Sequence, residues 1–189
     1  TMNTSRYTLL TIGKTHTGKT TLANELAPQI PRCVVLETDP IALFLKSSFT
    51  SLHTLDLDHS GGFSSPSLKF LVFKTILTFA LEENFNIIMS NSNMFENGRK
   101  DLLKIIKNYP GKIIGIYLNY SEEILSERIK KSDRDINVLR TSKDFGNLLI
   151  NQRTRFQPPN YSDFDYYFEV KDPNELPNIS TQIFKIFNS

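Results

Sequence analysis

The segment GKTHTGKT at residues 13–20 constrains this chain more than any other feature. It fits the pattern G-x-x-x-x-G-K-[ST], in which the glycines let the backbone curl so that successive N–H groups face an anion. It follows a short apolar run, Tyr7–Ile12, that is typical of a buried strand, and it opens a predicted helix over Lys19–Ala27. A strand, this loop and a helix, in that order, predict an α/β fold that binds the phosphates of a nucleotide.

Each residue type in the loop has a predicted task. The ammonium of Lys19 reaches the β- and γ-phosphates, and the hydroxyl of Thr20 is a ligand for Mg²⁺, so ATP and Mg²⁺ are the expected cofactors. His16 either contacts a phosphate or is a solvated loop histidine, and the second alternative is favoured. Thr21 either lies near the metal or only belongs to the first turn of the helix. The predicted nucleotide-binding residues are Gly13, Lys14, Thr15, His16, Thr17, Gly18, Lys19, Thr20 and Thr21.

Short apolar runs alternate with helical patterns along the rest of the chain. The other predicted strands are Cys33–Leu36, Asn86–Met89, Lys112–Leu118 and Phe164–Val170. The other predicted helices are a long one capped by Ser65, one around Arg99–Lys107, one from the cap Ser121 to about Lys131, one over Ser142–Phe156 and one in the tail from Asn174. This alternation predicts a three-layer α/β fold with a five-stranded parallel sheet. With 189 residues and no linker-like segment, we expect a single domain spanning residues 1–189.

Composition excludes several classes of protein. Hydrophobic residues make up 39% and charged residues 22%, which excludes a disordered or fibrous chain. The net charge of +2 gives no global argument for a nucleic-acid or membrane partner, and no apolar run reaches the roughly 18 residues that span a bilayer. The single cysteine, Cys33, has no partner for an internal disulfide, which favours a reducing, cytoplasmic location.

The loop predicts a nucleotide but not a reaction, and Asp39 is the first residue that favours a kinase. A GTP-binding switch protein would carry an N-K-x-D motif, and the sequence has none. Asp39 follows the second predicted strand, where a carboxylate lies across the site from the phosphate loop and accepts a proton from an attacking hydroxyl. The alternative is a turn residue or a helix cap. Glu37 is a weaker candidate for the same role.

A polar run ends the third predicted strand. Ser90, Asn91, Ser92 and Asn93 follow one another there, with Arg99 a little further on. Ligands of open α/β sheets bind at the carboxyl ends of the strands, so we expect this run to face the site. The alternative is a simple polar turn.

Basic residues are concentrated between residues 128 and 155. Arginines clamp phosphoryl oxygens and neutralise charge in the transition state, so we expect this segment to be a mobile basic lid over the nucleotide. The alternative is an ordinary solvated helix face. The basic residues are Arg128, Lys130, Lys131, Arg134, Arg140, Lys143, Arg153 and Arg155.

These segments together resemble the P-loop kinases of the polynucleotide-kinase type, to which zeta toxins and small-molecule phosphotransferases are related. The matching segments are Gly13–Thr20, Val34–Asp39, Asn86–Asn93 with Arg99, and Ser121–Arg134. The resemblance implies that Asp39 is the general base and that Arg128 and Arg134 are lid arginines. It implies an adenine pocket framed by residues 155–159 and by the backbone after Val170. The family's Asp-Thr-Asn after the third strand is replaced here by Asn91-Ser92-Asn93, so an amide stands where the family has an acid.

The acceptor of the phosphate stays open at the level of sequence. We predict an ATP- and Mg²⁺-dependent kinase that phosphorylates a hydroxyl of a small molecule, a nucleotide or a polynucleotide 5′ end. The catalytic residues would be Lys19, Asp39, Arg128 and Arg134. The alternative is a nucleotide-binding regulator or slow NTPase without an acceptor. A polynucleotide needs a basic groove with stacking aromatics, which a net charge of +2 supports only weakly. The segment Ser47–Ser65, with His53, Asp56, Asp58 and His59, either builds the acceptor site or is a surface loop.

Overall fold

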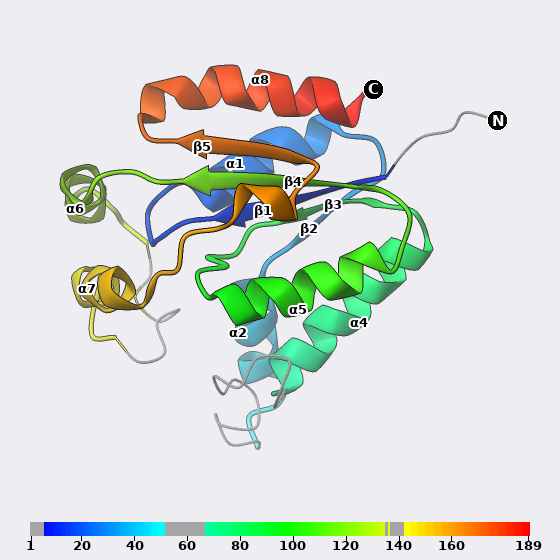
Figure 1. Cartoon of the computed structure of the whole chain (residues 1–189). Helices are drawn as coiled ribbons and strands as arrows, with labels where there is room; N and C mark the ends of the chain where they lie inside the picture. The colour runs from blue at the N-terminus through cyan, green and yellow to red at the C-terminus, as the bar shows by residue number, and fades with distance from the viewer. Residues whose placement is uncertain (1–5, 52–66, 135, 137–141) are drawn as a thin grey trace.

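Five parallel strands form one sheet in the order β2-β3-β1-β4-β5 (Figure 1). The structure is a computed structural model that describes residues 6–51, 67–134, 136 and 142–189. The strands are β1 Tyr7–Ile12, β2 Cys33–Leu36, β3 Asn86–Met89, β4 Lys112–Leu118 and β5 Tyr166–Val170. The five predicted strands and their parallel arrangement are therefore confirmed, with β5 beginning two residues later than predicted.

Helices cover both faces of the sheet and make it the middle of three layers (Figure 1). One face carries α1 Lys19–Leu26 and α8 Leu176–Phe187, and the other carries α4 Leu68–Glu82 and α5 Glu96–Lys107. Two more helices, α6 Glu122–Lys130 and α7 Phe145–Arg155, lie beyond the carboxyl ends of the strands. The phosphate-loop segment between β1 and α1 leaves the sheet at this same edge, which brings it next to α6 and α7. Among the described helices, none is long and apolar enough to cross a membrane.

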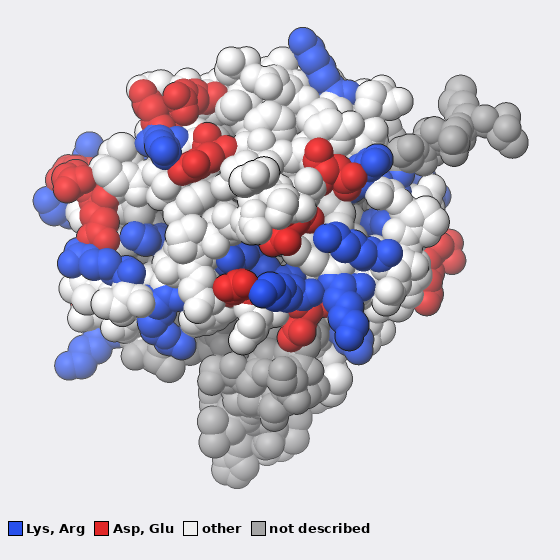
Figure 2. All heavy atoms as spheres, viewed as in Figure 1, with Lys and Arg blue, Asp and Glu red and all other residues white. Residues whose placement is uncertain are grey.

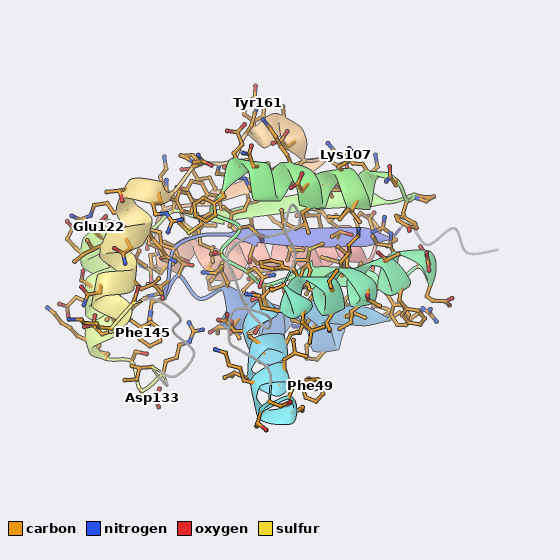
Figure 3. All side chains as sticks on the ribbon, turned by 90° about the horizontal axis from the view of Figure 1, so that it is seen from below. Phe49, Lys107, Glu122, Asp133, Phe145 and Tyr161 are labelled. Atoms are coloured by element: carbon orange, nitrogen blue, oxygen red, sulfur yellow. The ribbon has the colours of Figure 1, made fainter. Side chains whose placement is uncertain are left out.

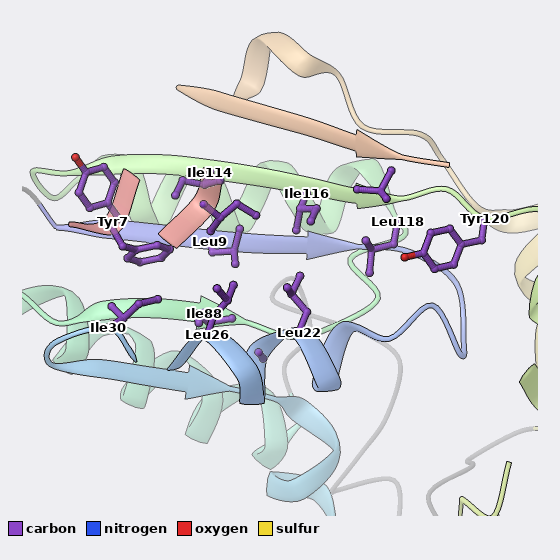
Figure 4. Close-up of a cluster of buried hydrophobic side chains, with 14 of the residues drawn as sticks. Tyr7, Leu9, Leu22, Leu26, Ile30, Ile88, Ile114, Ile116, Leu118 and Tyr120 are labelled. Atoms are coloured by element: carbon purple, nitrogen blue, oxygen red, sulfur yellow. The ribbon is translucent and has the colours of Figure 1, made fainter. Parts of the chain in front are cut away.

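The central strand explains the stability of the sheet. All six residues of β1 are buried, because helices pack on both of its faces. On the α1 side, Leu9 meets Leu22 and Leu26 of α1 in one apolar cluster (Figure 4). Fully burying a side chain such as Leu contributes about 1.5–3 kcal/mol relative to leaving it exposed. The phosphate loop thus connects a fully buried strand to a helix whose inner face is buried against it.

Helix α2, Thr38–Ser48, was not predicted from the sequence. Its N-cap is Glu37, whose side chain makes no capping hydrogen bond, so the usual start signal of Ser, Thr, Asp or Asn is missing. Only Ala42 and Leu45 are buried, and Phe44 is 62% exposed, which weakens the amphipathic pattern. Asp39 therefore lies in the first turn of a helix, where the helix dipole favours its negative charge.

Several helix boundaries differ from the predictions. The N-cap of α4 is Ser67, so the prediction that Ser65 caps this helix was wrong. Helix α7 begins at Phe145 after the cap Asp144, whose carboxylate accepts from the Asn147 N–H, and not at Ser142. Helix α5 begins earlier than predicted, at Glu96. The cap Ser121 of α6 is confirmed, because its hydroxyl accepts from the Ile124 N–H. The candidate acceptor residues His53, Asp56, Asp58 and His59 lie outside the described residues.

Candidate nucleotide-binding site

Glycines allow the loop to curl where side chains would not fit. A Cβ on Gly13 would lie 2.8 Å from the Thr17 hydroxyl and 3.1 Å from the Leu118 carbonyl oxygen, so only glycine is accommodated. Gly18 has φ +91° and His16 has φ +59°, both in the left-handed region. Alternation between right- and left-handed residues turns successive N–H groups to one side, which is the geometry of an anion-binding nest. The loop also opens α1, whose N-terminus adds its dipole.

The ammonium of Lys19 lies inside this loop. Its Nζ donates to the carbonyl oxygens of Lys14 at 2.6 Å and Gly13 at 3.1 Å, and to the Thr17 hydroxyl at 3.2 Å. The pKa of Lys19 is lowered to about 7, first because burial penalises the charged form and next because Arg134 lies nearby; Asp39 and Glu37 oppose the shift. A polyanion in the loop would raise this pKa, because it favours the protonated amine.

His16 is not the solvated loop histidine that the sequence favoured. Its ring packs edge-on against Phe145 of α7, with centroids 4.7 Å apart, and its Nδ1 is 2.9 Å from the Thr15 hydroxyl. Its Nε2 is buried and has no hydrogen-bond partner in the described structure. Burial lowers the pKa of His16, and Arg134, Lys19 and Arg128 lower it further. His16 is therefore neutral around pH 7 and packs α7 against the loop.

Two residues predicted from distant parts of the sequence meet at the site. The guanidinium of Arg134 donates to Asp39 Oδ2 at 3.2 Å, although the two residues are 95 positions apart. Both side chains are more than 40% exposed, so solvent screens the pair and it contributes little stability. The ion pair places a carboxylate and a cation together at the phosphate-loop edge of the sheet.

Asn91 supports this arrangement from the end of β3. Its Oδ1 accepts from the backbone N–H of Thr38 at 2.9 Å and from the Thr38 hydroxyl at 3.0 Å. Both bonds need only an acceptor oxygen. The amide of Asn91 supplies one as well as the carboxylate that the polynucleotide-kinase type has at this position. Within the polar run after the third strand, Asn91 is thus a support for the start of α2, next to Asp39.

We expect Asn91→Ala to lower turnover and Asn91→Asp to preserve it. The alanine variant leaves the half-buried Thr38 N–H without its acceptor, which costs up to about 1 kcal/mol and frees the segment that carries Asp39. The aspartate variant retains an acceptor at the same place. Turnover of both variants at saturating ATP is the measurement, and equal loss in both would show that the amide NH₂ matters instead.

Arg128 and Arg153 connect the helices at the strand ends to the loop. Arg128 donates to the His16 carbonyl oxygen at 3.2 Å and lies over the Tyr120 ring. Arg153 of α7 forms a two-bond ion pair with Glu122 of α6, and Glu122 also lies 3.4 Å from the Lys14 ammonium. Figure 3 shows Glu122 and Phe145 on the same side of the molecule. The predicted basic cluster is therefore partly neutralised by carboxylates; its mobility stays a prediction.

Arg99 and the aromatic segment after α7 hold the other side of the site. Arg99 is 3% exposed and donates to the carbonyl oxygens of Asn93 and Pro158, so it ties two loops together and does not face the predicted crevice. Phe156 stacks on Tyr117, with centroids 5.4 Å apart and planes 12° apart. Burial is the main cause that raises the pKa of Tyr117 to about 12. The predicted adenine pocket at residues 155–159 is not tested by these contacts.

A cleft of about 330 Å³ begins beside the loop and runs along the open edge of β2. Thr20 and Glu37 line its polar end, and Val35, Ile41 and Ile76 line its apolar wall. Glu37 Oε1 is buried and has no hydrogen-bond partner in the described structure. From the sequence Glu37 was the weaker candidate, and only the fold shows that it lines the same cleft as Thr20.

The oxygen atoms at this edge of the sheet suit a magnesium ion that is also bound by phosphates. The Thr20 hydroxyl, the unpartnered Glu37 oxygen and the Asp39 carboxylate all belong to this edge of the sheet. Mg²⁺ commonly takes one or two carboxylates from the protein and completes its shell with water and phosphate oxygens. Among the described residues, no group of three His, Cys, Asp or Glu side chains could hold a metal by itself. Thr20 and Thr21 are both exposed in the first turn of α1.

The low pKa of Lys19 predicts proton uptake on ATP binding. At pH 8 a lysine with a pKa of about 7 is mostly neutral, so binding of a polyanion should take up about one proton; at pH 6 it should take up about a tenth of one. The affinity for ATP should accordingly fall as the pH rises above about 7. Calorimetry at pH 8 in buffers with different ionisation enthalpies measures the uptake, with Lys14→Ala as the control that retains it. Binding without proton uptake at pH 8 would contradict the prediction.

Comparison with solved structures identifies the fold. No protein-family model matches this chain, and a comparison with curated proteins finds no match either. A protein of Chloroflexus aurantiacus is 17% identical with a TM-score of 0.70, covering 100% of this chain and 98% of that one. The APS kinase of Mycobacterium tuberculosis, in complex with AMPPNP and APS, is 11% identical with a TM-score of 0.63, covering 98% and 99%. A gluconokinase of Sinorhizobium meliloti is 14% identical with a TM-score of 0.59, covering 96% and 91%. The five-stranded sheet, the loop between β1 and α1 and these similarities show that the chain has the α/β fold of the P-loop kinases.

Proposed function

We propose that this protein is an ATP-dependent kinase that transfers the γ-phosphate to a hydroxyl group. The observation that carries the proposal is the contact between Asp39 and Arg134 beside the loop that encloses Lys19. A phosphate loop alone binds a nucleotide, but a carboxylate at the same edge can also accept the proton of an attacking hydroxyl. The likeness to an APS kinase in complex with AMPPNP supports ATP as the donor.

Each side chain has a role that follows from its position. The loop N–H groups and the Lys19 ammonium bind and orient the β- and γ-phosphates. Asp39 exchanges its partner Arg134 for the acceptor hydroxyl and takes its proton, while Arg134 and Arg128 neutralise charge on the transferred group. Mg²⁺, held by Thr20 with Asp39 or Glu37 nearby, would neutralise phosphate charge when bound.

The shape and charge of the surface favour a small acceptor. The cleft of about 330 Å³ beside Thr20 and Glu37 is the size of a small-molecule site. Figure 2 shows acidic and basic side chains interspersed over the visible face, whereas a polynucleotide track would gather basic ones. We therefore propose a small molecule or a nucleotide as the acceptor, ahead of a polynucleotide.

A transfer assay tests the proposal. The protein is incubated with Mg²⁺ and γ-labelled ATP, together with nucleosides, oligonucleotide 5′-hydroxyls, sugars or aminoglycosides, and the labelled products are separated. Label in an acceptor supports the kinase. Release of free phosphate alone, at a rate that no acceptor changes, would instead support a nucleotide-binding regulator or slow NTPase. Asp39→Asn run in parallel shows whether the label transfer depends on this site.

A further inference from the structure

Helix α7 touches the phosphate loop through a side chain that the proposed reaction does not use. The amide oxygen of Gln152 accepts a hydrogen bond of 2.7 Å from the backbone N–H of Thr15, a residue 137 positions away. Gln152 is 7% exposed and Thr15 is 5% exposed, so water does not substitute freely for either partner. The bond is therefore a specific link between α7 and the loop.

The peptide group to which the Thr15 N–H belongs is also held from its other side. The Lys14 carbonyl oxygen, which belongs to the Lys14–Thr15 peptide, accepts from Lys19 Nζ at 2.6 Å and from the Thr17 hydroxyl at 3.0 Å. In a trans peptide the C=O and N–H point in opposite directions. The carbonyl of this peptide thus faces the inside of the loop, and its N–H faces outward to Gln152.

The outward bond matters most when a nucleotide binds. The phosphates compete for the Lys19 ammonium, so the Lys14 carbonyl loses its 2.6 Å partner. Gln152 lies on the outer side and keeps its bond to the Thr15 N–H. That bond fixes the plane of the Lys14–Thr15 peptide, one residue before the peptide that leads into His16. His16 has a φ of +59°, a conformation that a non-glycine residue adopts only when its surroundings hold it there.

The position of α7 is itself fixed against the loop. Phe145 packs on the His16 ring at one end of the helix, and Arg153 binds Glu122, which lies beside Lys14, at the other. Helix α7 thus has one further direct contact with the loop, from Phe145 to His16, and one indirect contact with Lys14 through Glu122.

We infer that Gln152 is a positioning residue that sets the affinity of the phosphate loop for ATP. It holds the Lys14–Thr15 peptide in the orientation in which the following N–H groups face the phosphates. The inference rests on the nucleotide-binding part of the proposed function, and it is independent of which acceptor is phosphorylated.

The test removes the hydrogen-bond acceptor at residue 152 and keeps the length of the side chain. Gln152→Met should raise the dissociation constant for ATP about ten-fold, because a buried N–H is left unsatisfied in the free protein and the loop relaxes. Turnover at saturating ATP should change less than about two-fold, because Gln152 has no part in the proposed transfer step. Calorimetry gives the dissociation constant, and steady-state kinetics give the separation of KM from kcat.

Two control variants on the same helix separate positioning from general stability. Leu149→Ala removes a core side chain that is 4% exposed, and Asn151→Ala changes an exposed neighbour. Leu149→Ala should lower the melting temperature, and both should leave ATP affinity unchanged. Unchanged ATP binding in Gln152→Met would overturn the inference, as would an equal loss in Leu149→Ala. Wild-type protein that binds no ATP would instead overturn the proposed function itself.

Discussion

Lys19→Ala is expected to reduce turnover about 10²–10³-fold and to remove most of the affinity for ATP. The substitution deletes a charge that the loop holds in place and aims at the transferring group, and the loss of one such preorganised donor typically costs this much. Calorimetric titration with ATP and the transfer assay are the measurements.

Lys14→Ala is the matched control for that result. Lys14 lies in the same loop, but its ammonium faces Glu122 at 3.4 Å in a partly exposed ion pair. Such pairs contribute about 0–1 kcal/mol, so its loss should change ATP affinity only a few-fold. Equal effects of the two substitutions, or full ATP binding in Lys19→Ala, would contradict the assignment of Lys19 to the phosphates.

Asp39→Asn is expected to lower turnover about 10²–10⁴-fold while leaving ATP affinity nearly unchanged. The amide keeps the size of the side chain but cannot take a proton from an attacking hydroxyl. Steady-state kinetics at saturating ATP and acceptor measure the loss, and calorimetry checks that ATP still binds. Glu37→Gln, made in parallel, shows which of the two carboxylates is the base.

The ion pair with Arg134 offers a second explanation for a loss of turnover in Asp39→Asn. A double-mutant cycle distinguishes the two explanations. If Asp39 only positions Arg134, then Arg134→Gln should lower turnover as much as Asp39→Asn, and the double variant should be no worse than either single one. If Asp39 is the base, the double variant should lose more than Arg134→Gln alone. A loss of less than a few-fold in Asp39→Asn would mean that Asp39 is a helix N-terminal residue and no more.

Local pattern accounts for the parts of the fold that were predicted. Each strand is a short apolar run, almost wholly buried in β1 and β4, and the phosphate loop is a fixed spacing of glycines, lysine and threonine. These signals lie within a few residues of one another. Helix α2 was missed for the same reason, since its cap Glu37 and its exposed Phe44 give no local signal.

The sequence by itself determined the loop, the strands and the identity of Lys19 and Asp39 as candidates. Only the tertiary structure placed Arg134 against Asp39 and Gln152 against Thr15, and showed that Glu37 and Thr20 line the same cleft. Those pairings join elements on different strands and helices, and they depend on the strand order β2-β3-β1-β4-β5. Strand order is set by the packing of both faces of the sheet at once. A periodicity within one segment carries no information about which distant segment packs against it.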